Sequence, residues 1–161
     1  MEFAVKLVGA ALLVAVAVMY GRMKILEERH KVALISGMEG LVLAIRDGIA
    51  HYKKPLGEIY SSFSSDVLEE NGFLPRCRVD GIRAAWERTN MNLPPKMMEL
   101  MNSFTVQIGS GYTEDELRLC GHTLEQIGRI SAEALEEKNN REKLYINIPP
   151  LAALSAVLLF L

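Results

Sequence analysis

Few residues of this chain could do chemistry. One of its three histidines stands in the spacing of a metal-ligand motif. Glu27 and His30 stand three residues apart in a predicted helix, which is half of the ligand motif of di-iron carboxylate bundles. Such a site needs a second copy of the motif, but neither His51 nor His122 has an acidic residue three positions before it. We therefore interpret Glu27 and His30 as surface residues of a helix and predict no metal site.

The two cysteines, Cys77 and Cys120, do not form a CxxC pair and cannot build a disulfide framework, which fits a reducing compartment. Cys120 and His122 suggest a thiol or metal site only if further ligands lie nearby. Cys120 also falls at helical spacing between Leu117 and Leu124, which is typical of a small buried residue. Core packing is the interpretation that the spacing favours.

The segment Gly109-Ser110-Gly111 precedes a predicted helix start, where a phosphate group can bind. No predicted strand precedes this segment, no lysine follows at the P-loop position, and Glu114, Asp115 and Glu116 would repel an anion there. We interpret it as a turn. Since no nucleophile–base pair and no paired acids occur either, the sequence predicts no catalytic residue, no cofactor site and no enzymatic activity.

Two surfaces are candidates for binding. Met97, Met98 and Met101 are clustered and could form an adaptable groove, with Trp86 and Phe104 completing a ligand pocket, although core packing is the favoured alternative. The second candidate is a helix face that carries charges of both signs. We interpret it as a solvated surface with a Glu137–Arg141 pair, and a docking surface for a protein is the alternative. Its residues are Glu133, Glu136, Glu137, Lys138, Arg141, Glu142 and Lys143. Spacing alone leaves the partner-binding residues unknown.

The distribution of charge along the chain predicts the elements that carry these residues. The chain has 161 residues, of which 50% are hydrophobic and 24% charged, with a net charge of −2. The near-neutral charge excludes a basic nucleic-acid-binding surface, and the apolar content excludes a disordered chain. All but two of the charged residues lie between Arg22 and Lys143, so the two ends of the chain are apolar and almost free of charge.

Both ends are predicted to be membrane helices. Residues 3–21 contain one charge and would extend roughly 28 Å as a helix, while residues 145–161 contain none. Cations follow the first segment at Arg22 and Lys24 and precede the second at Arg141 and Lys143, so the positive-inside rule places both termini outside and the middle in the cytoplasm. A cleaved signal peptide and a buried C-terminal core helix are the alternatives. Pro149-Pro150 would start or kink the second helix.

Residues 22–144 show helical spacing throughout and predict a bundle of about six antiparallel helices between transmembrane segments 1–21 and 145–161. The expected apolar stripes are Val32, Ile35, Met38, Val42, Ile45 and Ile49; Leu56, Ile59, Tyr60 and Phe63; Val79, Ile82 and Trp86; Met97, Met101, Phe104 and Ile108; and Leu117, Cys120, Leu124 and Ile127. Gly37, Gly40 and Gly48 weaken the first helix. Turns are expected at residues 61–66, at Asn71-Gly72 and at Pro75, around one short helix.

Several short motifs in this order resemble the stage III sporulation protein AB family of endospore-forming bacteria. They are Tyr52-Lys53-Lys54-Pro55-Leu56, then Ala85-Trp86-Glu87, then Ile108 to Glu116 (IGSGYTEDE), and finally Glu142-Lys143-Leu144-Tyr145 before the last apolar segment. The resemblance implies a cytoplasmic bundle similar to the cytoplasmic domains of the type II secretion inner-membrane platform protein. It also implies a place in the secretion-like membrane complex between mother cell and forespore, with the sporulation ATPase (stage III sporulation protein AA) and other membrane subunits as partners.

Two functions from different classes follow. The first is a non-catalytic subunit in the mother-cell membrane around the forespore, which acts as a platform that docks a cytoplasmic ATPase. The alternative is a membrane-tethered regulatory or sensor adaptor, whose helical domain binds a small ligand or a signalling protein in the pocket of Trp86, Met97, Met101 and Phe104.

Overall fold

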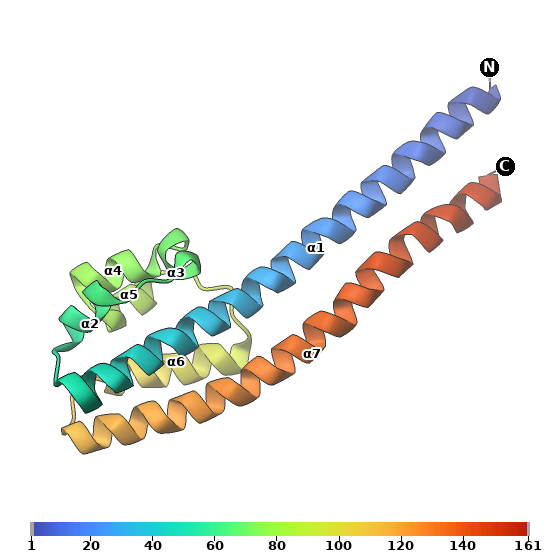
Figure 1. The fold of residues 1–161 in the computed structure, drawn as a ribbon. Helices are drawn as coiled ribbons and strands as arrows, with labels where there is room; N and C mark the ends of the chain where they lie inside the picture. Colours follow the sequence, from blue (N-terminus) through green and yellow to red (C-terminus); the bar gives the residue numbers. More distant parts are fainter. Residues whose placement is uncertain (1, 161) are drawn as a thin grey trace. The chain divides into compact units, whose positions relative to one another are not determined.

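A computed structural model describes the backbone of residues 2–160 and most side chains; those of residues 1–8, 10, 13, 147, 149–150, 152–154 and 156–161 lie outside the description. Every regular element in this part is a helix, which confirms the predicted all-α class (Figure 1). The elements are α1 (Glu2–Asp47), the π-helix η1 (Gly48–Tyr52), α2 (Leu56–Ser62), α3 (Asp66–Glu70), α4 (Phe73–Asp80), α5 (Ile82–Arg88), α6 (Pro95–Gln107) and α7 (Thr113–Phe160).

The chain forms two compact units. The first comprises residues 1–30 and 135–161, and the second comprises residues 31–134, inside the range 22–144 predicted for the bundle. Among the described residues, no helix is both long enough and apolar enough to cross a membrane. The predicted spans 1–21 and 145–161 fall in large part on side chains outside the description.

The first unit pairs the N-terminal part of α1 with the C-terminal part of α7, and the two chain ends lie at the same end of this pair (Figure 1). Two ion pairs join the helices: Arg29 Nη2 lies 2.5 Å from Glu142 Oε1, and Arg141 Nη1 lies 2.9 Å from Glu28 Oε1. The predicted Glu137–Arg141 pair along α7 is also present. These contacts hold the two helices in an antiparallel arrangement.

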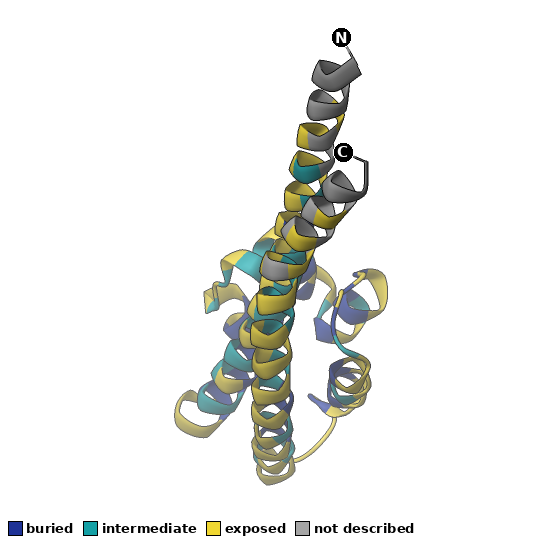
Figure 2. Ribbon diagram, turned by 90° about the vertical axis from the view of Figure 1, so that its right-hand side faces the viewer, coloured by how far each residue is buried: buried dark blue, intermediate teal, exposed yellow. Residues whose placement is uncertain are grey.

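The second unit contains the hydrophobic core, and its buried residues gather along the inner sides of its helices (Figure 2). The predicted stripe of α1 is confirmed from Ile35 to Ile49, with Leu34 and Leu41 buried as well, while Val32 is half-buried. The short helices pack against one another, with α4 in contact with α2, α3 and α5, and with α5 in contact with α6. Apolar burial of this kind is the main force that stabilises such a bundle.

One predicted helix is two helices in the structure. Val79, Ile82 and Trp86 were expected to share one buried helix face. The prediction is wrong for Val79, which is 84% exposed, while Ile82 and Trp86 are buried. Gly81 has φ +82° and ends α4, so a separate helix, α5, begins at Ile82. The buried face of α4 consists of Phe73, Leu74 and Cys77 and does not include Val79. The turn predicted at Pro75 is also wrong. Pro75 lies in the first turn of α4, where its missing N–H is not needed.

Candidate functional site

Ion pairs involve several residues of the Glu27–His30 motif in the structure. Glu27 accepts a hydrogen bond from Lys24 Nζ at 2.9 Å, a contact that raises the pKa of Lys24, and the intervening Glu28 and Arg29 bind α7. The imidazoles of His30, His51 and His122 are exposed. Within the described part of the chain, no group of three His, Cys, Asp or Glu side chains is placed to hold a metal ion.

Both thiols lie in the core of the second unit. Burial raises the pKa of Cys77 to about 12 and that of Cys120 to about 11, which keeps both sulfurs protonated at neutral pH. Thiolate is the reactive form of cysteine, so neither residue is arranged as a nucleophile or metal ligand. The interpretation of Cys120 as a core residue is confirmed.

The residues proposed to surround a ligand pocket are packed into the core. Met97, Met101 and Phe104 on α6 are almost completely buried, and Trp86 on α5 is buried and makes an edge-to-face contact with Phe73 at 6.2 Å between ring centroids. Only Met98 of the methionine cluster is exposed. These side chains fill space between helices, as the favoured core interpretation predicted.

The mixed-charge face of α7 is partly taken up by ion pairs. Glu133 accepts a hydrogen bond from Lys96 at 2.8 Å within the second unit. Glu137, Arg141 and Glu142 take part in the contacts of the first unit, and the hydrogen bond from Arg29 lowers the pKa of Glu142. Internal pairing therefore accounts for these four charges.

A different surface is formed where two loops of the second unit meet. The first segment consists of Tyr52, the last residue of η1, and the loop of residues 53–55 that leads into α2; the second is the loop of residues 108–112, which joins α6 to α7. A Cβ atom on Gly109 would lie 3.0 Å from the Leu56 side chain, and Gly109 has φ +85°, so close approach and backbone conformation both favour glycine there. We call these two loops, with the tyrosines Tyr52 and Tyr112, the tip surface.

The backbone leading into the tip surface is unusual. The α1 helix widens into the π-helix η1, a local form that is frequent at functional sites. Lys53 then adopts a left-handed conformation with φ +48°, and its N–H donates to the Gly48 carbonyl oxygen. The turn directs the chain from α1 into α2, and Lys54 Nζ lies 5.7 Å from the Tyr52 ring centroid and 3.3 Å from Glu58.

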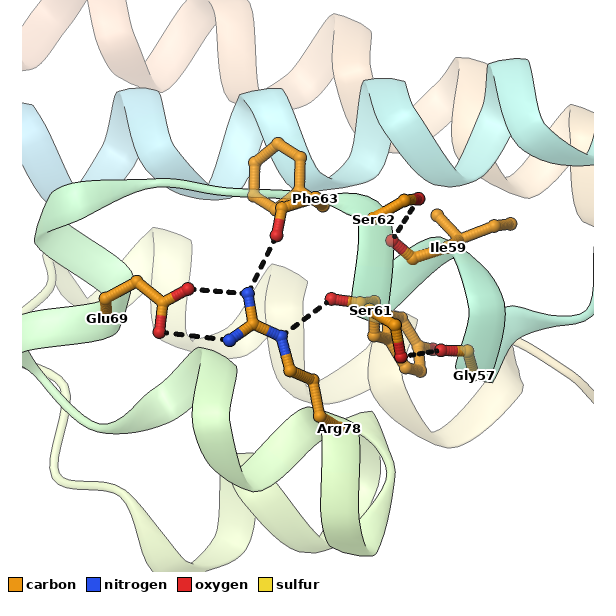
Figure 3. Close-up of polar contacts among 8 residues, drawn as sticks. Gly57, Ile59, Ser61, Ser62, Phe63, Glu69 and Arg78 are labelled. Atoms are coloured by element: carbon orange, nitrogen blue, oxygen red, sulfur yellow. Dashed lines mark hydrogen bonds and ion pairs between the residues drawn. The ribbon is translucent and has the colours of Figure 1, made fainter.

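Arg78 on α4 fastens the other end of α2 (Figure 3). Its guanidinium donates to the carbonyl oxygens of Tyr60 and Phe63, at 3.1 and 2.9 Å, and to both carboxylate oxygens of Glu69 on α3. The carbonyl groups at a helix C-terminus have no partner within the helix, so a forked cation satisfies them well. Arg78 therefore joins α2, α3 and α4 beneath the tip surface.

The tip surface suits recognition of a protein. Tyr52 is 70% exposed and Tyr112 is 85% exposed, and tyrosines of this kind often provide much of the binding energy of an interface. Lys53 and Lys54 provide positive charge, while Glu114 and Asp115 follow Tyr112 at the start of α7. Sequence reasoning did not select these residues for binding, although both loops lie in motifs that carry the family resemblance.

A family model described as stage III sporulation protein AB matches residues 6–161. Searches among curated proteins and among solved structures found no match. The matched range includes most of the first unit, all of the second unit and the tip surface.

Proposed function

The chain belongs to the stage III sporulation protein AB family, and we propose that it is a non-catalytic platform subunit of a secretion-like membrane complex. Its tip surface docks the cytoplasmic sporulation ATPase, stage III sporulation protein AA. The observation that carries this proposal is the pair of exposed tyrosines, at the end of η1 and in the loop before α7, together with the close approach of Gly109 to Leu56.

Membrane anchoring is the second part of the proposal. The apolar segments 1–21 and 145–161 cross the mother-cell membrane around the forespore, with both termini outside the cytoplasm. The support is the sequence itself: the two segments are nearly free of charge, and cations stand on the inner side of each. Other membrane subunits of the complex would contact the same segments.

The mechanism follows from packing rather than from chemistry. A platform transmits motion when its helices move as rigid bodies, since close-packed side chains deform little. Docking at the tip surface would act on η1 and α2, and Arg78 on α4 ties α2 to α3. Nucleotide-driven movement of the ATPase would then reach the bundle and, through α1 and α7, the membrane part.

Binding of the purified ATPase to the full chain in lipid nanodiscs tests the docking site. Tyr52→Ala and Tyr112→Ala should each weaken binding by about 30-fold, the effect of losing about 2 kcal/mol at an aromatic anchor. Val79→Ala is the matched control, because Val79 is equally exposed but lies on α4. Unchanged affinity in both tyrosine variants, or an equal loss in the Val79 variant, would contradict docking at the tip surface.

Cysteine labelling in intact cells tests the topology. A Ser64→Cys variant carries an exposed thiol on the second unit, whereas Cys77 and Cys120 are buried and give a low background. A membrane-impermeant reagent should label this thiol only after the cells are opened. Labelling of intact cells would reverse the orientation and exclude a cytoplasmic ATPase as the partner.

The adaptor function was the alternative suggested by the sequence. Its pocket residues Met97, Met101, Phe104 and Trp86 are core residues, so no observation favours a ligand pocket there.

A further inference from the structure

Lys53 has a backbone conformation that lysine rarely adopts. Its φ is +48° and its ψ is +34°, in the left-handed region, and among the described residues no other residue except glycine has a positive φ. In this conformation the Cβ atom of an L-residue crowds the following carbonyl oxygen, so the residue that adopts it after a helix is usually glycine and sometimes asparagine. Lys53 is therefore strained at a position where glycine would not be.

The turn explains the conformation of Lys53 but not its side chain. The backbone N–H groups of Lys53 and Lys54 both donate to the Gly48 carbonyl oxygen, which ends η1 before the chain enters α2. Both hydrogen bonds involve only backbone atoms, so a glycine at position 53 would form the first of them equally well. The turn requires a left-handed residue here and does not require an ammonium group.

The two lysines of this turn differ in what their side chains contact. Lys54 Nζ lies 3.3 Å from Glu58 Oε1 and 5.7 Å from the centroid of the Tyr52 ring. The Lys53 side chain is exposed, and within the described part of the chain its ammonium group has no ion pair and no hydrogen bond. Lys53 therefore carries the unpaired positive charge of the loop that leads into α2.

An exposed lysine at this position has two possible roles. A cation near a helix C-terminus stabilises the helix dipole, which is a role within the fold. Arg46 in the last turn of α1 and Lys54 already place positive charge at this helix end. An unpaired cation next to an exposed tyrosine instead suits a protein interface, where the partner supplies the opposite charge.

We propose that Lys53 determines the specificity of the tip surface by pairing its ammonium group with a carboxylate of the docked partner. The partner's contact surface presents an acidic side chain opposite the loop of residues 53–55. This inference rests on the proposed docking at the tip surface, because it names the chemistry that the partner offers there.

Replacement of Lys53 by glycine separates a role in the fold from a role in the interface. Lys53→Gly should leave the urea midpoint of the full chain in detergent unchanged or raise it by up to roughly 0.5 M, because relief of strain offsets the freedom of glycine in the unfolded chain. The same variant should weaken binding of the purified ATPase to the chain in lipid nanodiscs by about tenfold. A lower midpoint would show that the lysine side chain stabilises the fold, as a helix-dipole role requires, and would overturn the proposal.

Two further variants identify the charge as the cause. Lys53→Asn also tolerates the left-handed conformation and should weaken binding about tenfold, whereas Lys53→Arg keeps the charge and should stay within about threefold of the unsubstituted chain. Lys96→Asn is the matched control, because Lys96 is an exposed lysine of the same unit that lies in the first turn of α6 and pairs with Glu133. A tenfold loss in Lys96→Asn or in Lys53→Arg would overturn the proposal.

Salt tests whether the contact is an ion pair. At about 1 M salt the Debye length is about 3 Å, so exposed charges are largely screened. The tenfold difference in affinity between the unsubstituted chain and Lys53→Asn should then fall below about threefold. A tenfold difference that persists at this salt concentration would overturn the pairing with a carboxylate.

The Tyr52→Ala variant in the same assay separates this proposal from the proposed function. Weaker binding of Tyr52→Ala with unchanged binding of Lys53→Asn would leave docking at the tip surface intact and overturn the role of Lys53. Unchanged binding of both variants would contradict docking at the tip surface and, with it, the role of Lys53.

Discussion

At the scale of single residues, Arg78 does the most to organise the short helices. Its guanidinium contacts the backbone carbonyl groups of Tyr60 in α2 and of Phe63 just after it, and also the Glu69 carboxylate on α3. Hydrogen bonds that involve a charged group contribute about 1.5–3 kcal/mol each when partly buried. Only arginine offers donors in a planar fork that reaches all of these acceptors together.

Replacement of Arg78 by lysine should therefore destabilise the second unit although the charge is kept. We expect Arg78→Lys to lower the free energy of unfolding by about 2 kcal/mol, measured by urea denaturation of the full chain in detergent. Arg83→Lys is the matched control, because the Arg83–Glu87 pair along α5 is exposed and such pairs contribute less than about 0.5 kcal/mol. Similar losses in both variants would show that the fork of Arg78 has no special role.

At the scale of elements, glycines set how closely helices approach. Gly37 on α1 faces α3, and a Cβ atom there would lie 2.9 Å from Val67 Cγ1 and 3.1 Å from Leu68 Cγ. Gly48 likewise faces Ile59, with 2.6 Å to its Cδ1 atom. By helix propensity alone these glycines are weak points of a helix, and in the structure they make room for α2 and α3.

Alanine substitution should distinguish packed glycines from open ones. Gly37→Ala should destabilise the fold by about 1–3 kcal/mol through overpacking, which outweighs the gain of about 1 kcal/mol in helix propensity. Gly121→Ala on α7 meets nothing within 4 Å and should stabilise the fold by up to about 1 kcal/mol. Both shifts are measurable by urea denaturation. Stabilisation by Gly37→Ala to the level of Gly121→Ala would contradict the close approach of α1 and α3.

At the scale of the whole molecule, the core belongs to one unit. Among the side chains that the structure describes, the buried hydrophobic residues run from Leu34 to Ile130, all within residues 31–134. Two ion pairs, Arg29–Glu142 and Glu28–Arg141, join α1 and α7 in the first unit. A chain segment of this length has enough apolar surface for an independent core.

A fragment of residues 31–134 should therefore fold alone. We expect it to unfold in one cooperative thermal transition, followed by circular dichroism in the aromatic region, which reports fixed packing around Trp86. Phe104→Ala in the same fragment should remove about 3–5 kcal/mol of stability, because it leaves a cavity at a fully buried position. A fragment with helical signal but no cooperative transition would show that the core needs the first unit.

The sequence by itself determined the helical class and most of the core. Apolar spacing at 3.6 residues identified Ile35 to Ile49, Ile59 and Tyr60, and the buried face of α6, because burial on a helix follows directly from local periodicity. It also identified the ion pair of Glu137 and Arg141, which lie one turn apart. Local spacing contains this information, so no tertiary contact was needed.

Tertiary structure alone decided the contacts between distant segments. The break at Gly81 that exposes Val79, the fork of Arg78, and the pairing of Glu28 with Arg141 depend on the path of the backbone through space. The tip surface belongs to the same group, since Gly109 in the loop before α7 lies close to Leu56, the first residue of α2. Periodicity reports which side of a helix is buried, but the partner on that side is set by the packing of the whole unit.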